Sequence, residues 1–147
     1  MSFVKIKKFL NLDFKYKIMF FEAFFYTAIY RMCIKLIPFK KLNKYMGKLN
    51  EESTNCININ NYRIAKQVGV AISTVSRFTP WKSKCLVQAL TAQKMMKKRK
   101  ISTTLYLGVK KDDENQLIAH AWIRCGTFYI TGGAIRQRYS VVAKYAV

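Results

Sequence analysis

Acidic residues are scarce in this chain of 147 residues. The sequence has 7 Asp plus Glu against 27 Lys plus Arg, which gives a formal net charge of +20 at pH 7. No carboxylate follows Glu114, so catalysis by a pair of carboxylates is excluded from the part of the chain after it. The excess of Lys and Arg is present in residues 1–50 and in residues 51–147, which excludes a merely basic tail. We therefore expect a basic surface whose partner is nucleic acid, anionic lipid or an acidic peptide.

Histidine and cysteine are too few, and too far apart, for a metal site. The chain has 1 His and 4 Cys, and the cysteines are Cys33, Cys56, Cys85 and Cys125. Since there is no CxxC pair and no second His, a classical zinc site has no support, and we expect neither a metal nor a cofactor. Residues 1–17 hold five lysines and no cleavage site of small residues, which argues against a secretory signal. Free thiols then predict a cytoplasmic protein.

A long uncharged apolar run is absent too, although 51% of the residues are hydrophobic. Residues 14–37 are the most apolar stretch, but only residues 18–30 are nearly free of charge. A helix of that length rises about 20 Å, too little to span about 30 Å of hydrocarbon. We expect a helix over residues 14–37 that packs on the rest of the protein or on a partner, and that ends or kinks at Pro38. Its aromatics and the lysines after it leave open contact with an anionic membrane surface, which would make the protein membrane-associated.

The polar, Asn-rich residues 50–61 are the best candidate for a linker. They divide the chain into an N-terminal helical segment, residues 1–50, and a core domain, residues 51–147. Within the core, the apolar spacing predicts helices over residues 64–78 and 84–98.

Ser83 is the expected N-cap of the helix over residues 84–98. Beyond residue 100 the apolar pattern changes to a period of two, which predicts β-strands. The expected strands are residues 103–109, 117–125, 127–131 and 140–147. Helices followed by an antiparallel sheet predict an α+β fold.

Cys85 and His120 are the strongest candidates for chemistry. A helix that starts at residue 84 puts Cys85 in its first turn, where unpaired N–H groups and the helix dipole stabilise a thiolate. His120 lies in the middle of an expected strand, between two alanines. A cysteine at a helix N-terminus with a histidine on a following strand is the arrangement of papain-like and transglutaminase-like cysteine enzymes. The alternative is a structural cysteine and an incidental histidine.

The sequence around these two residues contains further motifs in a fixed order. A Pro-Trp pair precedes Cys85, a Cys-Leu-x-x-Ala helix start follows, and the strands contain Leu-x-Leu-Gly-Val and His-Ala-Trp. Together with the earlier stretch EAFFYTAIYRMCIKLIPFKKLNKYMG, these motifs resemble the leader peptidases of lasso-peptide biosynthesis, which belong to the transglutaminase-like superfamily. The resemblance covers about residues 20–145.

This resemblance implies a papain-like and transglutaminase-like core and a cysteine endopeptidase that cuts the leader from a lasso precursor peptide. Cys85 would be the nucleophile and His120 the general base and acid. A separate leader-recognition protein would present the precursor, and an ATP-dependent macrolactam synthetase would close the ring. We do not expect a nucleic acid partner from this resemblance, and it implies no cofactor.

The chain departs from the family pattern at the residue that orients the imidazole. The family places an Asp about a dozen residues after His-Ala-Trp, whereas this chain has Thr131, Gly132 and Gly133 there. We therefore expect Thr131 or a backbone carbonyl to orient His120, or a catalytic dyad. The missing carboxylate also favours an alternative, a catalytically inactive peptide-binding scaffold.

Two tryptophans stand near the candidate catalytic residues, and we assign both to substrate binding. Trp81 either packs at the cleft or donates its N–H to an oxyanion. Trp122 would lower the dielectric constant around the Cys–His pair.

Residues 62–78 suggest a competing function, because they resemble a DNA-binding helix-turn-helix. Gly69 would supply the turn and Ser73 would cap the recognition helix. The net charge of +20 fits this hypothesis. Against it, the recognition helix would have to end before Pro80, after barely a turn and a half.

Overall fold

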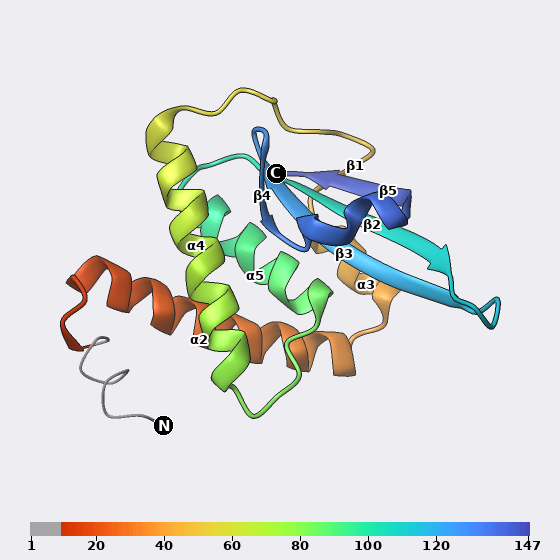
Figure 1. Cartoon of the computed structure of the whole chain (residues 1–147), viewed down its shortest axis with the longest axis horizontal. Coiled ribbons are helices and arrows are strands. Elements are labelled where there is room, and N and C mark those ends of the chain that lie inside the picture. The colour runs from red at the N-terminus through yellow and green to blue at the C-terminus, as the bar shows by residue number, and fades with distance from the viewer. Residues whose placement is uncertain (1–9) are drawn as a thin grey trace.

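The chain forms its long helices first and most of its sheet last (Figure 1). The structure is a computed structural model that describes residues 10–147, so residues 1–9 of the expected N-terminal segment lie outside the described part. The helices are α2 (Phe14–Leu36), α3 (Phe39–Leu42), α4 (Ile59–Phe78) and α5 (Cys85–Lys98), with 3-10 helices η1 (Asn43–Tyr45) and η2 (Gly133–Arg138). The strands are β1 (Lys48–Leu49), β2 (Thr104–Lys111), β3 (Leu117–Cys125), β4 (Phe128–Thr131) and β5 (Ser140–Ala146). This order confirms the predicted α+β fold.

The five strands form one antiparallel sheet in the order β1-β5-β2-β3-β4. β2 and β3 pair over their whole length, with Gly108 opposite His120 and Tyr106 opposite Trp122. β4 is an edge strand that pairs only with residues 123–125 of β3. The rest of β3, which includes His120, therefore has no neighbouring strand on that side within residues 10–147.

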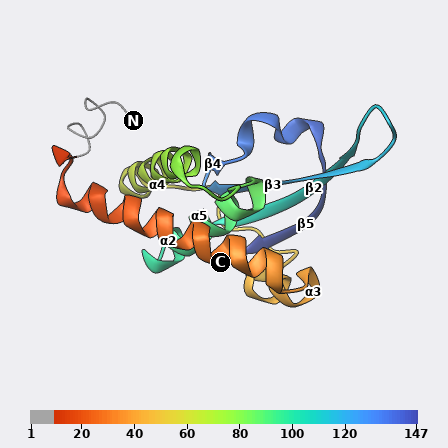
Figure 2. The same ribbon diagram turned by 90° about the horizontal axis from the view of Figure 1, so that it is seen from below.

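Helices α4 and α5 pack on one face of the sheet, and α2 packs on α4 and α5 from outside (Figures 1 and 2). Buried side chains of alternate residues on the strands, such as Leu105, Ala121 and Ile123, join those of the helices in one hydrophobic core. The helix expected over residues 14–37 is present as α2 and packs on the rest of the protein through Met19 and Ala23. Among the described helices, none is both long enough and apolar enough to cross a membrane.

α4 begins five residues earlier than the sequence pattern predicts. Asn58 is its N-cap, and the side chain of Asn58 accepts a hydrogen bond from the N–H of Asn61 at 2.8 Å. Part of the Asn-rich stretch that we interpreted as a linker is thus a helix start.

The rest of that stretch lies on the outer face of the sheet, where it is fixed by Arg124. The guanidinium of Arg124 is buried and donates hydrogen bonds to the side-chain oxygen of Asn55 at 2.7 Å and to the carboxylate of Glu52 at 3.2 Å. Residues 51–57 are therefore an ordered connection. The division of the chain into residues 1–50 and 51–147 stays a prediction.

The helix-turn-helix hypothesis for residues 62–78 is wrong, because α4 is one uninterrupted helix from Ile59 to Phe78. Gly69 makes no turn. A Cβ atom at Gly69 would lie 2.9 Å from the carbonyl oxygen of Ile130, so the glycine allows α4 to approach the edge strand β4 closely.

Candidate active site

Cys85 is the first residue of α5. The extended residue Lys84 precedes it as N-cap and contributes no side-chain hydrogen bond to the helix. The free thiol of Cys85 is partly buried and packs against the hydrophobic core. The thiol therefore lies at the positive end of the α5 dipole, which stabilises negative charge.

The prediction that Ser83 caps α5 is wrong. Ser83 stands one residue outside the N-cap position, too far along the chain for its hydroxyl to reach the first N–H groups of the helix. That hydroxyl is buried without a hydrogen-bond partner among the described residues, while the carbonyl of Ser83 accepts from the side chain of Gln88 at 2.8 Å.

His120 lies in the middle of β3, and its ring contacts Gly132, Tyr139 and Trp122. Its Nε2 is 2.8 Å from the carbonyl oxygen of Gly132. The rings of Tyr139 and Trp122 lie 4.9 Å and 5.8 Å from the imidazole, centroid to centroid. Because a carbonyl oxygen only accepts, Nε2 carries the proton in this bond, and Nδ1 of the neutral ring is left with a free lone pair.

The atom that orients His120 comes from the backbone and not from Thr131. Thr131 is the last residue of β4, and its buried hydroxyl has no hydrogen-bond partner in the described part of the chain. The chain then leaves the strand at Gly132, whose left-handed conformation (φ 71°, ψ 0°) accompanies the bond from its carbonyl to the imidazole. The prediction of Thr131 as the orienting side chain is thus wrong, and the backbone carbonyl, its stated alternative, makes the contact.

Gly132 cannot be exchanged for a larger residue without rearrangement. A Cβ atom there would lie 2.4 Å from the carbonyl oxygen of Ala121 and 3.0 Å from Cβ of Trp122. Gly132 is 12 residues after His120, where the resemblance described above expects an Asp. This backbone therefore has no room for the expected carboxylate, and the carbonyl of Gly132 contacts the ring.

Cys85 and His120 come from elements that touch, because α5 packs on β3. Ala121 and Ile123 face the helical core, so alternation turns His120 to the other face of β3. Both views show the first turn of α5 beside β3 (Figures 1 and 2). Within residues 10–147, no hydrogen bond joins the thiol of Cys85 to the ring of His120.

The two tryptophans differ in their surroundings. Trp122 is buried and stacks on Tyr106 at 5.6 Å and 9°, beside the ring of His120. Trp81 packs edge-on against Phe24 of α2 at 5.1 Å, and its buried Nε1 has no hydrogen-bond partner in the described structure. A role in substrate binding stays a prediction for both.

Sequence reasoning missed Tyr139, which contacts the imidazole from the connection between η2 and β5. No motif marks this residue. The one indirect signal is Gly108, opposite His120, since a Cβ there would lie 2.7 Å from the ring of Trp122 and 2.9 Å from Cβ of Tyr139.

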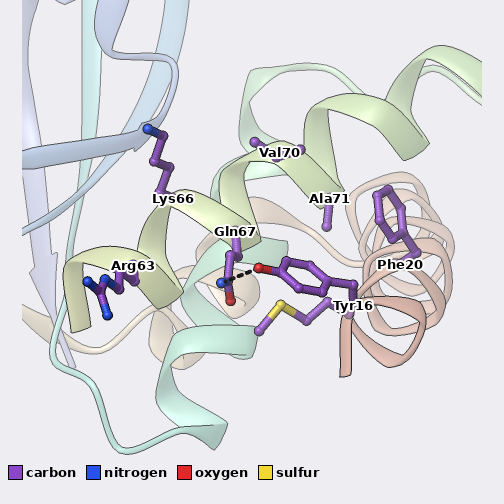
Figure 3. A pocket seen from close by; sticks show the side chains of 8 residues that line it. Tyr16, Phe20, Arg63, Lys66, Gln67, Val70 and Ala71 are labelled. Atoms are coloured by element: carbon purple, nitrogen blue, oxygen red, sulfur yellow. Dashed lines mark hydrogen bonds between the residues drawn. The ribbon is translucent and has the colours of Figure 1, made fainter. Parts of the chain in front are cut away.

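A pocket of about 290 Å³ lies between α2 and α4, and its lining contains neither Cys85 nor His120 (Figure 3). It is mostly apolar, and at one side the hydroxyl of Tyr16 accepts a hydrogen bond from the side-chain amide of Gln67 at 2.8 Å. This pocket is separate from the candidate active site. No cluster of three or more His, Cys, Asp or Glu in the described residues could hold a metal ion.

Comparison with known proteins agrees with this architecture. The family model of the transglutaminase-like superfamily matches residues 36–144, which is most of the chain. The chain therefore belongs to the transglutaminase-like superfamily, which includes cysteine peptidases and transglutaminases. No curated protein and no solved structure matches it.

Proposed function

We propose that this protein is a cysteine endopeptidase that removes the leader peptide from a lasso-peptide precursor. The observation that carries the proposal is the bond from Nε2 of His120 to the carbonyl of Gly132, at the chain position of the family Asp. It leaves Nδ1 of His120 as a base, in a superfamily member whose Cys85 starts a helix. The lasso motifs around both residues supply the substrate class.

In the proposed reaction, Nδ1 of His120 takes the proton of the Cys85 thiol. The sulfur then forms a bond to the carbonyl carbon at the junction of leader and core peptide. The backbone N–H of Cys85 donates to the oxyanion of the tetrahedral intermediate. When this intermediate collapses, the carbon–nitrogen bond breaks and the imidazolium of His120 protonates the leaving amine of the core peptide.

The leader remains bound to Cys85 as a thioester until water attacks it. His120 takes a proton from that water, the carbon–sulfur bond breaks, and the thiolate is protonated again. The free leader carboxylate and the free enzyme are the products. The proposed proton transfer requires a rearrangement that brings the Cys85 thiol within reach of Nδ1 of His120, because His120 lies on the face of β3 away from α5 in the free protein.

The proposal includes the partners that the resemblance implies. A separate leader-recognition protein would present the disordered precursor and make the cleavage step effectively intramolecular. A macrolactam synthetase would then close the ring of the released core peptide. The four free thiols fit a cytoplasmic location, where thiols stay reduced.

The test combines the protein with a precursor peptide and its recognition protein, and measures leader release by mass spectrometry. We expect Cys85→Ala to lower the rate at least about 1,000-fold, because the nucleophile is lost. The matched control Cys56→Ala removes an exposed thiol and should leave the rate unchanged within about twofold. If Cys85→Ala cleaves at the parental rate, Cys85 is not the nucleophile.

Iodoacetamide labelling distinguishes an enzyme from an inactive scaffold. In the enzyme, Cys85 should react faster than the other three thiols near pH 6, and His120→Gln should remove this advantage. Equal labelling of all exposed thiols together with no cleavage would support the scaffold. Fast labelling of Cys85 without leader release would retain a thiol enzyme and overturn the lasso-precursor substrate.

A further inference from the structure

α2 has apolar side chains on two opposite sides, and only one side is buried. The inner side, with Met19, Ala23 and Thr27, is buried against α4 and α5. The outer side carries seven large apolar residues that are each between 40% and 72% exposed. We name these residues the α2 stripe: Phe14, Ile18, Phe21, Phe25, Ile29, Met32 and Leu36.

The α2 stripe is continuous along the whole helix. Its members are spaced three or four residues apart, so they fall on one side of a 3.6-residue helix. The 23 residues of α2 give the stripe a length of about 34 Å. Contiguous exposed apolar patches of this kind mark contact sites on proteins.

The charges beside the α2 stripe are almost all positive. Lys15, Arg31 and Lys35 belong to α2, and exposed lysines at positions 40, 41 and 44 follow it. The carboxylate of Glu22 is not available there, because Lys98 and Arg99 bind it at 2.6 Å and 2.5 Å on the inner side. Among residues 10–147, the exposed Asp13, just before the helix, is the remaining acid near the stripe.

We propose that the α2 stripe docks on the surface of a lipid bilayer that contains anionic lipid, with α2 parallel to that surface. The apolar side chains would enter the acyl-chain boundary, and the surrounding Lys and Arg would contact lipid phosphates. A net charge of +20 attracts such a surface and opposes the other simple occupant, a second copy of the chain. Two copies joined through their α2 stripes would bring the Lys and Arg side chains beside each stripe close together, and like charges repel.

This docking does not cover the side of the protein that carries His120. α2 lies on the outer side of α4 and α5 (Figure 2). Alternation along β3 turns His120 to the face of the sheet away from the helical core. The proposal rests on the shape and charge of α2 alone, so it holds or fails independently of cleavage activity.

Vesicle flotation tests the proposal. The full chain is mixed with vesicles of phosphatidylcholine, or of an equal mixture of phosphatidylcholine and phosphatidylglycerol, and the bound fraction is measured after centrifugation. We expect binding to the mixed vesicles and little to phosphatidylcholine alone. The variant Phe21→Gln/Phe25→Gln/Ile29→Gln should lower the partition coefficient at least about tenfold, because three side chains no longer leave water.

The matched control places three glutamines at exposed apolar residues of the sheet, Leu117→Gln/Val141→Gln/Val142→Gln, and should bind within about twofold of the parent. Circular dichroism checks that the variants are folded, and Phe25→Gln alone serves if the triple variant is not. No binding of the parent to mixed vesicles would overturn the proposal. So would equal binding of the stripe variant, which would mean attraction by charge alone. A dimer in light scattering that the stripe variant dissociates, without vesicle binding, would make a second copy the occupant.

Discussion

His120 and Cys85 are held by different kinds of structure. The imidazole of His120 is fixed by a backbone carbonyl at 2.8 Å and by the rings of Trp122 and Tyr139. Cys85 stands at the start of a helix without a side-chain N-cap, among partly buried residues that pack on the core. The histidine side of the candidate site thus depends on local backbone geometry, and the cysteine side depends on how α5 is held by α2 and α4.

This difference determines which substitutions should affect each side. On the histidine side, a single methyl group at Gly132 meets backbone atoms that cannot move away. On the cysteine side, the strongest polar link between α2 and α5 is the contact of Glu22 with Lys98 and Arg99, at the other end of α5 from Cys85. Damage to the histidine side should be local and large, and damage to the cysteine side should be distributed and small.

Gly132→Ala should have the largest effect. The variant must hold a Cβ in a left-handed conformation and 2.4 Å from the carbonyl of Ala121, which should lower the free energy of unfolding by about 2–4 kcal/mol. Because the backbone must shift, His120 should also lose its bond to residue 132, and leader release should fall together with stability. Urea unfolding and the cleavage assay measure the two effects.

The control for backbone strain alone is Asn115→Ala, an exposed residue with φ 62° in the turn between β2 and β3. This substitution should lower the free energy of unfolding by only about 1 kcal/mol and leave the rate of leader release unchanged. Gly132→Asp restores the carboxylate of the family pattern, and we expect it to be as unstable as Gly132→Ala. An active, stable Gly132→Asp would contradict the steric account of this glycine.

The cysteine side of the site could be predicted from the sequence because its signals are local. A break at Pro80 followed by apolar spacing predicted a helix from residue 84, and α5 begins at Cys85. The period-two pattern around His120 predicted β3 with its bounds, because alternation along a half-buried strand is visible in a single segment. The N-caps could not be predicted in the same way. Ser83 and Asn58 are both residue types that favour the N-cap position, and only the packed helix ends show that Asn58 caps a helix and Ser83 does not.

The histidine side could not be predicted in full because it depends on contacts between distant segments. A backbone carbonyl has no sequence signature, so the prediction allowed a backbone carbonyl without assigning it to Gly132. The ring contact of Tyr139 depends on the path of η2 over the sheet, which a single segment does not encode. The sequence also did not predict which side of α2 would be exposed, since a helix that is apolar on two sides can bury one side or both.

Glu22→Gln should have a moderate effect on stability. It removes the ion pairs that join α2 to the end of α5. Burial alone would raise the pKa of Glu22, but hydrogen bonds from Lys98 and Arg99 outweigh it and hold the pKa below the ordinary value of 4.5. Since the pKa is lower in the folded state, this carboxylate stabilises the protein above pH 4.5, and the stabilisation is lost as the pH falls through the lowered pKa.

At pH 7 we therefore expect Glu22→Gln to lower the free energy of unfolding by about 1 kcal/mol, which corresponds to a decrease of about 3 °C in Tm. The difference between parent and variant should shrink toward zero as the pH falls through the lowered pKa of Glu22. Thermal unfolding from pH 3 to pH 7 measures both. Glu51→Gln, in an exposed pair with Lys48, is the control and should change Tm by less than about 1 °C. A difference that does not depend on pH would contradict the assigned ion pair.

Thr131→Val should have the smallest effect, and it tests whether His120 is oriented without the hydroxyl of Thr131. The hydroxyl of Thr131 is buried without a hydrogen-bond partner in the described part of the chain, so replacing it by a methyl group removes an unsatisfied polar atom and keeps the branched shape. We expect the free energy of unfolding to stay equal or to rise by up to about 1 kcal/mol, and leader release to stay within about twofold of the parent.

The matched control is Thr104→Val, a buried threonine whose hydroxyl accepts a hydrogen bond from the N–H of Ser53 at 2.8 Å. Thr104→Val should lower the free energy of unfolding by about 1 kcal/mol, because it leaves the N–H of Ser53 without its hydrogen-bond acceptor. If Thr131→Val slowed leader release tenfold or more at unchanged stability, the hydroxyl and not the carbonyl of Gly132 would orient the imidazole.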